Sequence, residues 1–318
     1  MIAQGLTRRR ALAIVAATAG IAGLGGRVPG ELVSQWRGTA LGAQGRLLLA
    51  GMARARSREA IAMALAEVER LEGIFSLYRP DSELSRLNAE GRIEGPSHDL
   101  RVLTGQALAW WRRSEGAFNP AIQPLWAFLA RHFAASPAAE PDAARLAELL
   151  ALADPRRVGL DDARITLAPG MALSFNGIAQ GYITDRVAAL LRQAGFADVL
   201  VDLGEFFALP GRSWPIATAG SDGTIDLASR ALATSAAAGT LFSADGRWHH
   251  LIDPASGHSA GGFRSVTVAA ASASDADALA TAFAVAGPAA FGRLAARFPE
   301  VAVRAVLGDG RRLAAGRV

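Results

Sequence analysis

The sequence of 318 residues contains no cysteine and no lysine. The lack of cysteine excludes disulfide bonds, cysteine nucleophiles, zinc ribbons and iron–sulfur ligation. All 33 basic residues are therefore arginine, and with only two tyrosines few groups titrate near pH 10, so the pI of about 10.6 overstates the charge. The formal net charge is only +4, and no dense basic run follows the N-terminal segment, so nucleic-acid binding is not expected.

Composition and pattern together predict a globular α+β protein. The chain is 51% hydrophobic and 19% charged, which separates it from disordered chains. Helical and strand patterns are interspersed without regular alternation, so we expect mixed or antiparallel sheets with packed helices. Expected helices cover residues 58–71 with Ser57 as cap, 100–113, 143–152, 181–194 and part of 276–287. Expected strands cover residues 35–42, 45–50, 164–167, 171–175, 199–203, 225–228, 231–234, 248–252, 265–270 and 301–306.

The N-terminus is expected to be a targeting segment with a linker (residues 1–30), followed by one domain (residues 31–318). Arginines at positions 8, 9 and 10 precede a weakly apolar, alanine- and glycine-rich stretch, a pattern typical of twin-arginine export signals. That stretch is too short to span a bilayer well, which needs roughly 20 apolar residues. We therefore expect a periplasmic location or one at the outer face of the inner membrane, with no transmembrane span in the mature chain. An ordinary cytoplasmic N-terminus is the alternative.

The motif DALAT, residues 277–281, places one carboxylate and one hydroxyl four residues apart in an apolar helix. A period of 3.6 residues puts Asp277 and Thr281 on the same helical face. Hard oxygen donors on one face suggest a magnesium site. The alternative is that Asp277 lies in the first helical turn, where a carboxylate interacts favourably with the helix dipole, and that Thr281 is incidental.

The segment FNGIAQGYITD, residues 175–185, combines two glycines with the start of a helix. Gly177 and Gly181 allow the backbone to approach a ligand closely, and the free N–H groups of a helix N-terminus favour phosphate. A strand-to-helix turn that needs small residues would give the same pattern. Asp185 is either part of such a site or a solvent-facing helical carboxylate.

Two histidines begin the polar segment WHHLIDPASG, residues 248–257. Adjacent side chains alternate faces in a strand, so only one of His249 and His250 is expected to point inward. A histidine at that place suits proton transfer at neutral pH, although a buried, hydrogen-bonded histidine would serve structure alone. Asp253 belongs to a turn that could hold the segment against a ligand.

Two further polar segments lie earlier in the chain. In SLYRPDSELSRLN, Ser82 and Glu83 could bond an adenine or ribose edge and Tyr78 could stack on a ring, while Ser82 could equally cap a helix. In GAFNPAIQPLW, Trp126 is expected in the core.

Taken in their order and spacing, these five segments resemble those of the ApbE-like flavin transferases, from about Gly38 to Gly287. The resemblance implies the fold of that family and the transfer of FMN from FAD to a threonine hydroxyl of a target protein. It also implies magnesium held by Asp277, Thr281 and the backbone carbonyl of Ala179, and it makes His250 the expected proton acceptor. The FAD contacts implied or suggested are Tyr78, Ser82, Glu83, Asn119, Asn176, Gly177, Gln180, Gly181, Asp185, His250 and Asp253.

Several positions depart from the family pattern. Gln180 replaces the usual lysine, and a neutral amide can hydrogen-bond a diphosphate but cannot neutralise it. Asn119 and Ala121 replace the common aspartate and threonine. Glu205 stands at the second position of the usual double glycine, and Ala236 replaces the glycine of a serine-glycine pair. These changes bear on FAD affinity and rate more than on fold.

The resemblance thus predicts a magnesium-dependent FAD:protein FMN transferase that releases AMP. Its expected partner is an acceptor protein with a threonine flavinylation site, such as a membrane respiratory subunit exposed outside the cytoplasm. Three alternatives stay open: an exported FAD-binding assembly factor without transferase activity, an FAD diphosphatase, and an exported domain without a ligand.

Overall fold

The computed structural model describes residues 33–40, 43–218 and 224–317. The expected export segment, residues 1–30, lies outside these ranges. The described residues form a mixed helix and antiparallel-sheet structure, so the predicted α+β fold class is confirmed.

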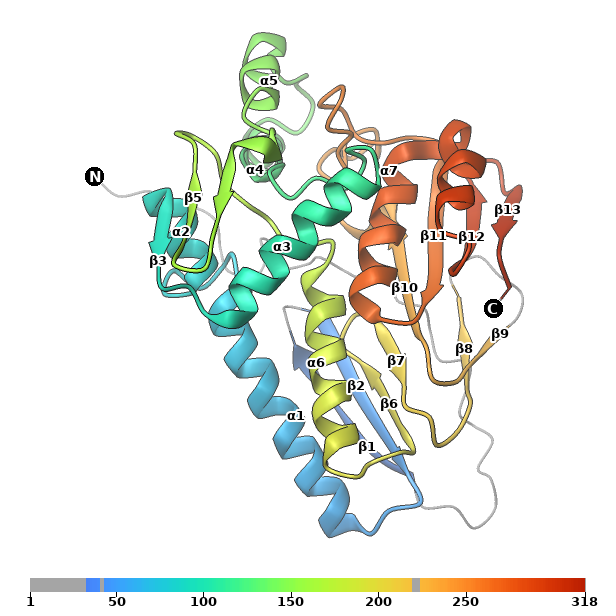
Figure 1. Cartoon of the computed structure of the whole chain (residues 1–318). Helices are drawn as coiled ribbons and strands as arrows, with labels where there is room; N and C mark the ends of the chain where they lie inside the picture. Colours follow the sequence, from blue (N-terminus) through green and yellow to red (C-terminus); the bar gives the residue numbers. More distant parts are fainter. Residues whose placement is uncertain (1–32, 41–42, 219–223, 318) are drawn as a thin grey trace.

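An eight-stranded sheet runs through the molecule in the order β1-β2-β6-β7-β10-β11-β12-β13, and every neighbouring pair is antiparallel (Figure 1). Most of its central strands are buried throughout, because the sheet is covered on both faces. The strands are β1 (Val33–Ala40), β2 (Ala43–Ala50), β6 (Val199–Asp202), β7 (Phe206–Ala208), β10 (Ala231–Ala236), β11 (Phe263–Ala270), β12 (Ala302–Leu307) and β13 (Arg312–Ala315).

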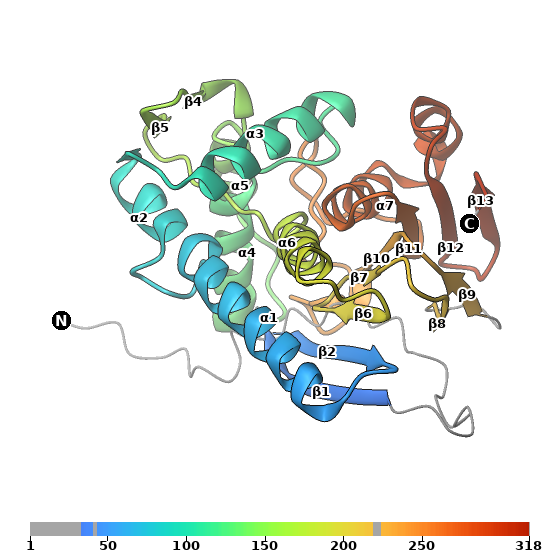
Figure 2. The ribbon, with the colours of Figure 1, turned by 60° about the horizontal axis from the view of Figure 1, so that its bottom comes forward.

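Three long helices, α1 (Arg54–Phe75), α6 (Ala179–Gln193) and α7 (Ala273–Arg297), cover one face of this sheet, as Figure 2 shows. Helix α7 contacts β10 and β11, and α6 packs between α7 and α1. Their apolar residues and the inner face of the sheet form the largest core cluster. The N-terminal turns of α6 and α7 therefore meet above β7 and β10.

The opposite face is covered by a hairpin of β8 (Trp214–Ala217) and β9 (Thr224–Leu227). A second region contains α3 (His98–Arg113), the short helices α2 (Glu83–Glu90), α4 (Gln123–Ala135) and α5 (Ala143–Leu150), and a small sheet in the order β3-β5-β4. That sheet comprises β3 (Arg92–Glu94), β4 (Val158–Leu160) and β5 (Arg164–Leu167), and two short 3-10 turns cover Pro155–Arg157 and Ala237–Gly239.

Two expected strands are not strands. Residues 171–175 are mostly buried, but their backbone bonds to a helix and a loop: the side chain of Asn88 in α2 pairs with both backbone groups of Leu173, and Ser174 N–H donates to the carbonyl of Pro120. Residues 248–252 make only isolated bridges, Leu241 to His249 and Ile252 to Ser259. An apolar run shows that a segment is buried, not that another strand lies beside it.

Four expected helices begin two to four residues earlier than the pattern indicated, among them α3 at His98 and α6 at Ala179. Helix α1 begins at Arg54, and Ser57 lies inside it, where its hydroxyl bonds to Ala53 rather than capping the helix. Helix α7 begins at Ala273 after the cap Ser272 and continues to Arg297 across a break at Gly287. Within the described ranges α7 alone is long and apolar enough to cross a membrane, yet it packs against β10, β11 and α6 as a core helix does.

Candidate functional site

A cavity of about 110 Å³ opens where the first turn of α6, the middle of α7, the end of β10 and two loops converge. It gathers residues from four of the five segments singled out in the sequence. The predicted site residues that line it are Asn119, Asn176, Gly177, Gln180, His250, Asp277 and Thr281.

The first turn of α6 is tied directly to α7. Gly181 N–H donates a 3.1 Å hydrogen bond to Oδ2 of Asp277. A Cβ on Gly181 would clash with the carbonyl oxygen of Ala273, so this glycine permits close helix packing rather than an approach to a ligand. Asp185 faces the same junction and accepts hydrogen bonds from the backbone of Ala273 and Ser274. It is therefore a cap for α7 and does not line the cavity.

Asp277 is almost fully buried, and it lies beyond the first turn of α7, where the acidic residue is Asp275. The helix-dipole explanation thus fits Asp275 better than Asp277. Burial raises the pKa of Asp277 to about 7; the Gly181 hydrogen bond lowers it, and the charge of Asp185 raises it further. One turn on, the hydroxyl of Thr281 lies 3.3 Å from that of Ser235. Both α7 donors face the cavity, as the 3.6-residue period predicts.

Gly177 fits tightly against this pair. A Cβ there would lie 2.9 Å from the hydroxyl oxygen of Thr281 and 3.3 Å from the ring of Phe118. Glycine is therefore needed to bring the 175–178 turn against α7. The preceding residue, Asn176, also lines the cavity.

Glu205 is a site residue that the sequence pattern marked only as a departure from the family. It follows the turn between β6 and β7, is 5% exposed and lines the same cavity as Asp277. Burial raises its pKa well above the usual value, and the charge of Asp277 raises it further. An acidic residue between two buried apolar strands was the signal that could have found it.

The donor set of the cavity fits a hard divalent cation. In the part of the chain described by the structure, no group of three or more histidine and acidic residues could hold a metal ion. The cavity instead offers carboxylate oxygens from Asp277 and Glu205 and hydroxyls from Thr281 and Ser235. Oxygen donors of this kind suit magnesium, which often keeps several waters. Ala179, the first residue of α6, is buried in the core and does not line the cavity, although the next residue, Gln180, does.

His250 also lines the cavity. Its Nδ1 lies 3.2 Å from the amide N and 3.3 Å from the carbonyl O of Thr240. Burial lowers its pKa to about 4, so the imidazole is neutral at pH 7. When Nδ1 donates its proton to the carbonyl, Nε2 is free to accept one. His249 is occupied elsewhere, because its Nε2 lies 2.9 Å from the carbonyl O of Ala260.

Besides Gly181 and Asp185, four more predicted FAD contacts do not line the cavity. Ser82 caps α2, accepting from Ser85 N–H and donating to the carbonyl of Ser76. Glu83 accepts from Ser97 N–H at 2.9 Å, which joins α2 to the start of α3, and Tyr78 is exposed. Asp253 closes its own turn and lines a neighbouring groove of about 510 Å³.

Two other cavity residues have mixed roles. The amide of Asn119 bonds to Ala153 and Ala121, so it shapes a loop as well as lining the cavity. Trp126 packs edge-on against Phe242, with ring centroids 5.4 Å apart, as expected of a core residue. It also lines the cavity, which was not expected.

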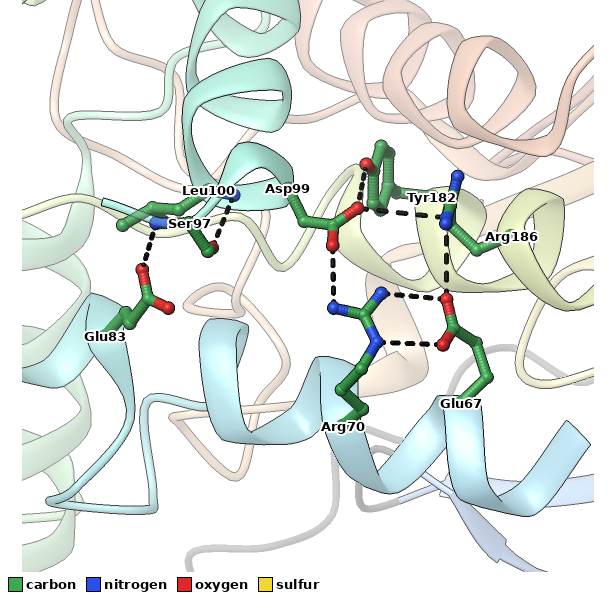
Figure 3. A network of polar contacts seen from close by, with 8 residues as sticks. All are labelled: Glu67, Arg70, Glu83, Ser97, Asp99, Leu100, Tyr182 and Arg186. Atoms are coloured by element: carbon green, nitrogen blue, oxygen red, sulfur yellow. Dashed lines mark hydrogen bonds and ion pairs between the residues drawn. The ribbon is translucent and has the colours of Figure 1, made fainter. Parts of the chain in front are cut away.

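A polar network fixes α6 against α1 and α3 (Figure 3). Tyr182 donates a 2.6 Å hydrogen bond to Asp99, and Arg70 bridges Asp99 and Glu67. Arg186 lies 3.5 Å from Glu67 and 3.8 Å from Asp99. The network orients the helix that begins with Ala179 and Gln180, and no sequence pattern predicted it.

The chain is similar in sequence to known proteins. Residues 41–305 match the family model described as the ApbE family. A protein named FAD:protein FMN transferase from Treponema pallidum (strain Nichols) is 33% identical over 295 residues, which cover 80% of this chain and 80% of the relative. A protein of the same name from Klebsiella pneumoniae (strain 342) is 33% identical over 207 residues, covering 60% of this chain and 64% of the relative.

The fold has a counterpart among solved structures. The crystal structure of the ApbE protein from Thermotoga maritima matches with a TM-score of 0.80, covering 89% of this chain and 97% of that one. Its sequence identity is 24%, so this likeness concerns the fold alone. The family model and the Treponema relative both extend over most of the sequence, and the chain belongs to the ApbE family.

Proposed function

We propose that this protein is a magnesium-dependent FAD:protein FMN transferase that modifies a threonine hydroxyl of an acceptor protein. The observation that carries the proposal is the convergence of Asp277, Thr281 and His250 on one cavity. The named relatives support a transferase that moves FMN from FAD to a protein. Magnesium, the threonine acceptor and release of AMP are the finer parts of the proposal.

The metal-binding residues and His250 have separate roles in the proposed reaction. Asp277, Thr281 and the Ala179 carbonyl would hold magnesium, which supplies charge stabilisation for the diphosphate and the departing AMP. The acceptor oxygen forms a bond to the FMN phosphorus while the diphosphate P–O bond breaks. His250 accepts the hydroxyl proton at Nε2, and its neutral imidazole at pH 7 suits that role.

The charges around the cavity support a need for a cation. Of its described lining residues, the charged ones are Glu205 and Asp277, and none is arginine. Gln180 provides an amide where a cation would offset phosphate charge. A bare diphosphate would therefore meet no cationic side chain among these residues, and a divalent cation would supply the missing positive charge.

We further propose that the acceptor is a membrane-associated electron-transfer protein exposed outside the cytoplasm. This part rests on the arginine-led, alanine- and glycine-rich N-terminal segment and its likeness to a twin-arginine signal. Export of residues 31–318 as a folded domain would bring the site to such an acceptor.

The decisive experiment incubates the protein with FAD, magnesium and an acceptor peptide containing the threonine, followed by mass spectrometry. We expect the peptide to gain the mass of FMN with stoichiometric AMP. AMP without peptide modification would identify a diphosphatase instead, and tight FAD binding without either product would identify an assembly factor.

The metal assignment is tested in the same assay. Asp277→Ala and chelation should each abolish transfer, while Asp226→Ala, an exposed carboxylate on β9, should leave it unchanged. Transfer that survives both chelation and Asp277→Ala would refute the metal site without refuting the transferase.

A further inference from the structure

Glu205 lines the cavity but is not one of the proposed metal ligands Asp277, Thr281 and Ala179. It follows the β6–β7 turn, where Leu203 N–H donates to the Glu205 carbonyl. The hydroxyl of Thr184 lies 3.4 Å from that same carbonyl oxygen, which ties the turn to α6. The carboxylate is thereby held on a rigid hairpin and shares the cavity with Asp277 and Thr281.

One oxygen of this carboxylate lacks a partner. Oε2 of Glu205 is buried and makes no hydrogen bond with any described residue, and the residue as a whole is 5% exposed. The backbone of Thr234 provides a hydrogen bond to the carboxylate. A buried carboxylate oxygen without a donor or a cation is strongly unfavourable, so its presence needs an explanation.

Neighbouring protein cations do not supply that partner. Arg46 on β2 donates a 3.0 Å hydrogen bond to Asp202 on β6, so the charge of Arg46 is already matched. The other nitrogen-bearing side chains of the cavity are also not cations. They are the amides of Gln180, Asn119 and Asn176, the indole of Trp126 and the neutral imidazole of His250. The unpartnered oxygen of Glu205 therefore belongs to a cavity that holds a second buried acidic side chain, Asp277.

We infer that Glu205 is an additional ligand of the divalent cation at the Asp277–Thr281 site, and that this site binds the cation before FAD arrives. Two carboxylates and a hydroxyl form a hard-oxygen set that suits Mg²⁺ or Mn²⁺. The inference rests on the proposed function for the metal site itself, and it adds a carboxylate at position 205, where the family pattern implies glycine.

The test measures Mn²⁺ binding to the full chain without FAD or acceptor, using the EPR signal of free Mn²⁺. Glu205→Gln keeps the shape of the side chain and removes its charge. We expect it to weaken Mn²⁺ binding at least tenfold, a loss of about 1.4 kcal/mol. Asp202→Asn makes the same chemical change on the same hairpin outside the cavity, and we expect it to alter Mn²⁺ affinity less than threefold.

Thermal unfolding supplies a second readout. Without metal, Glu205→Gln should melt at the same temperature as the parent protein or higher, because Oε2 of Glu205 has no partner that the substitution would remove. With saturating Mn²⁺ the parent should gain more stability than the variant. A merely structural glutamate would instead lower the metal-free melting temperature.

The outcomes separate this inference from the proposed function. Equal Mn²⁺ affinities for Glu205→Gln and the parent, or no Mn²⁺ binding without FAD, would overturn the ligand role even if FMN transfer proceeds. If Glu205 instead acts as a protonated hydrogen-bond donor to the diphosphate, Glu205→Gln would bind Mn²⁺ as tightly as the parent protein and would bind FAD more weakly. Failure of FMN transfer would refute the proposed function and leave the Mn²⁺ measurement to decide Glu205.

Discussion

Gly181 and Asp277 are joined by a 3.1 Å hydrogen bond from the backbone of α6 to the side chain of α7. The connection is reciprocal, because Asp185 of α6 accepts from Ala273 N–H at the start of α7. Two helices from distant parts of the sequence thus hold each other's first turns. The bond fixes one oxygen of Asp277 and leaves the other for a ligand in the cavity.

Gly181→Ala should destabilise the protein and impair the site together. Its Cβ would clash with the carbonyl oxygen of Ala273, so α6 and α7 must separate. We expect a loss of about 1–3 kcal/mol in the free energy of unfolding. Urea denaturation measures the loss, and Mn²⁺ affinity should fall with it.

The matched control is Gly73→Ala. Gly73 is inside α1, and a Cβ added there would have no neighbouring atom within 4 Å. Replacing a helical glycine by alanine should stabilise the protein by about 0.5–1 kcal/mol. Equal stabilities for the two variants would mean that close packing at Gly181 is unimportant.

Because His250 is buried in its neutral form, it should make the free energy of unfolding sensitive to acid. Burial lowers its pKa from 6.5 to about 4, so the unfolded chain binds its proton more readily than the folded one. This contribution is fully present above pH 6.5 and is lost as pH falls toward 4. Between pH 7.5 and 4.5 the parent should lose about 2–3 kcal/mol more than His250→Gln, since each pKa unit corresponds to about 1.4 kcal/mol.

Urea titrations of both proteins at those two pH values measure the difference. His249 also has a pKa lowered by burial, but it is present in both proteins and cancels. A His250→Gln variant with the same loss as the parent would show that His250 is not buried in its neutral form.

Tyr182→Phe should weaken the network that positions α6. The lost hydroxyl donates a 2.6 Å hydrogen bond to Asp99, which is 6% exposed. Hydrogen bonds to charged groups contribute about 1.5–3 kcal/mol, so chemical denaturation should show a loss of that order. Tyr78→Phe, at the exposed second tyrosine, should change stability by less than about 0.5 kcal/mol.

Gln180→Lys should tighten FAD binding. The side chain lines the cavity, whose described charged groups are both acidic, and a lysine there would attract the diphosphate. We expect at least a threefold lower dissociation constant for FAD, measured by flavin fluorescence in the presence of magnesium. Gln193→Lys, at the exposed end of the same helix, provides the control, and an equal effect of both changes would assign the gain to overall charge.

Helix α7 illustrates what local pattern can predict. The 3.6-residue period correctly placed Asp277 and Thr281 on one face. Of the two histidines only His250 lines the cavity, but residues 248–252 are not a strand and His249 is buried as well, so alternation is not the reason. The same local logic failed at residues 171–175, where burial is real but the hydrogen-bond partners are Asn88 and Pro120 rather than a strand.

The sequence by itself determined the fold class, the order of the five segments and the types of donor they carry, because these depend on composition and local periodicity. Tertiary structure alone decided which donors meet. It directed Asp185 and Ser82 to helix caps, and it brought Glu205 beside Asp277 across 72 positions of chain. Such placement depends on how the β6–β7 hairpin and α7 pack, and no short pattern encodes the contact of two distant elements.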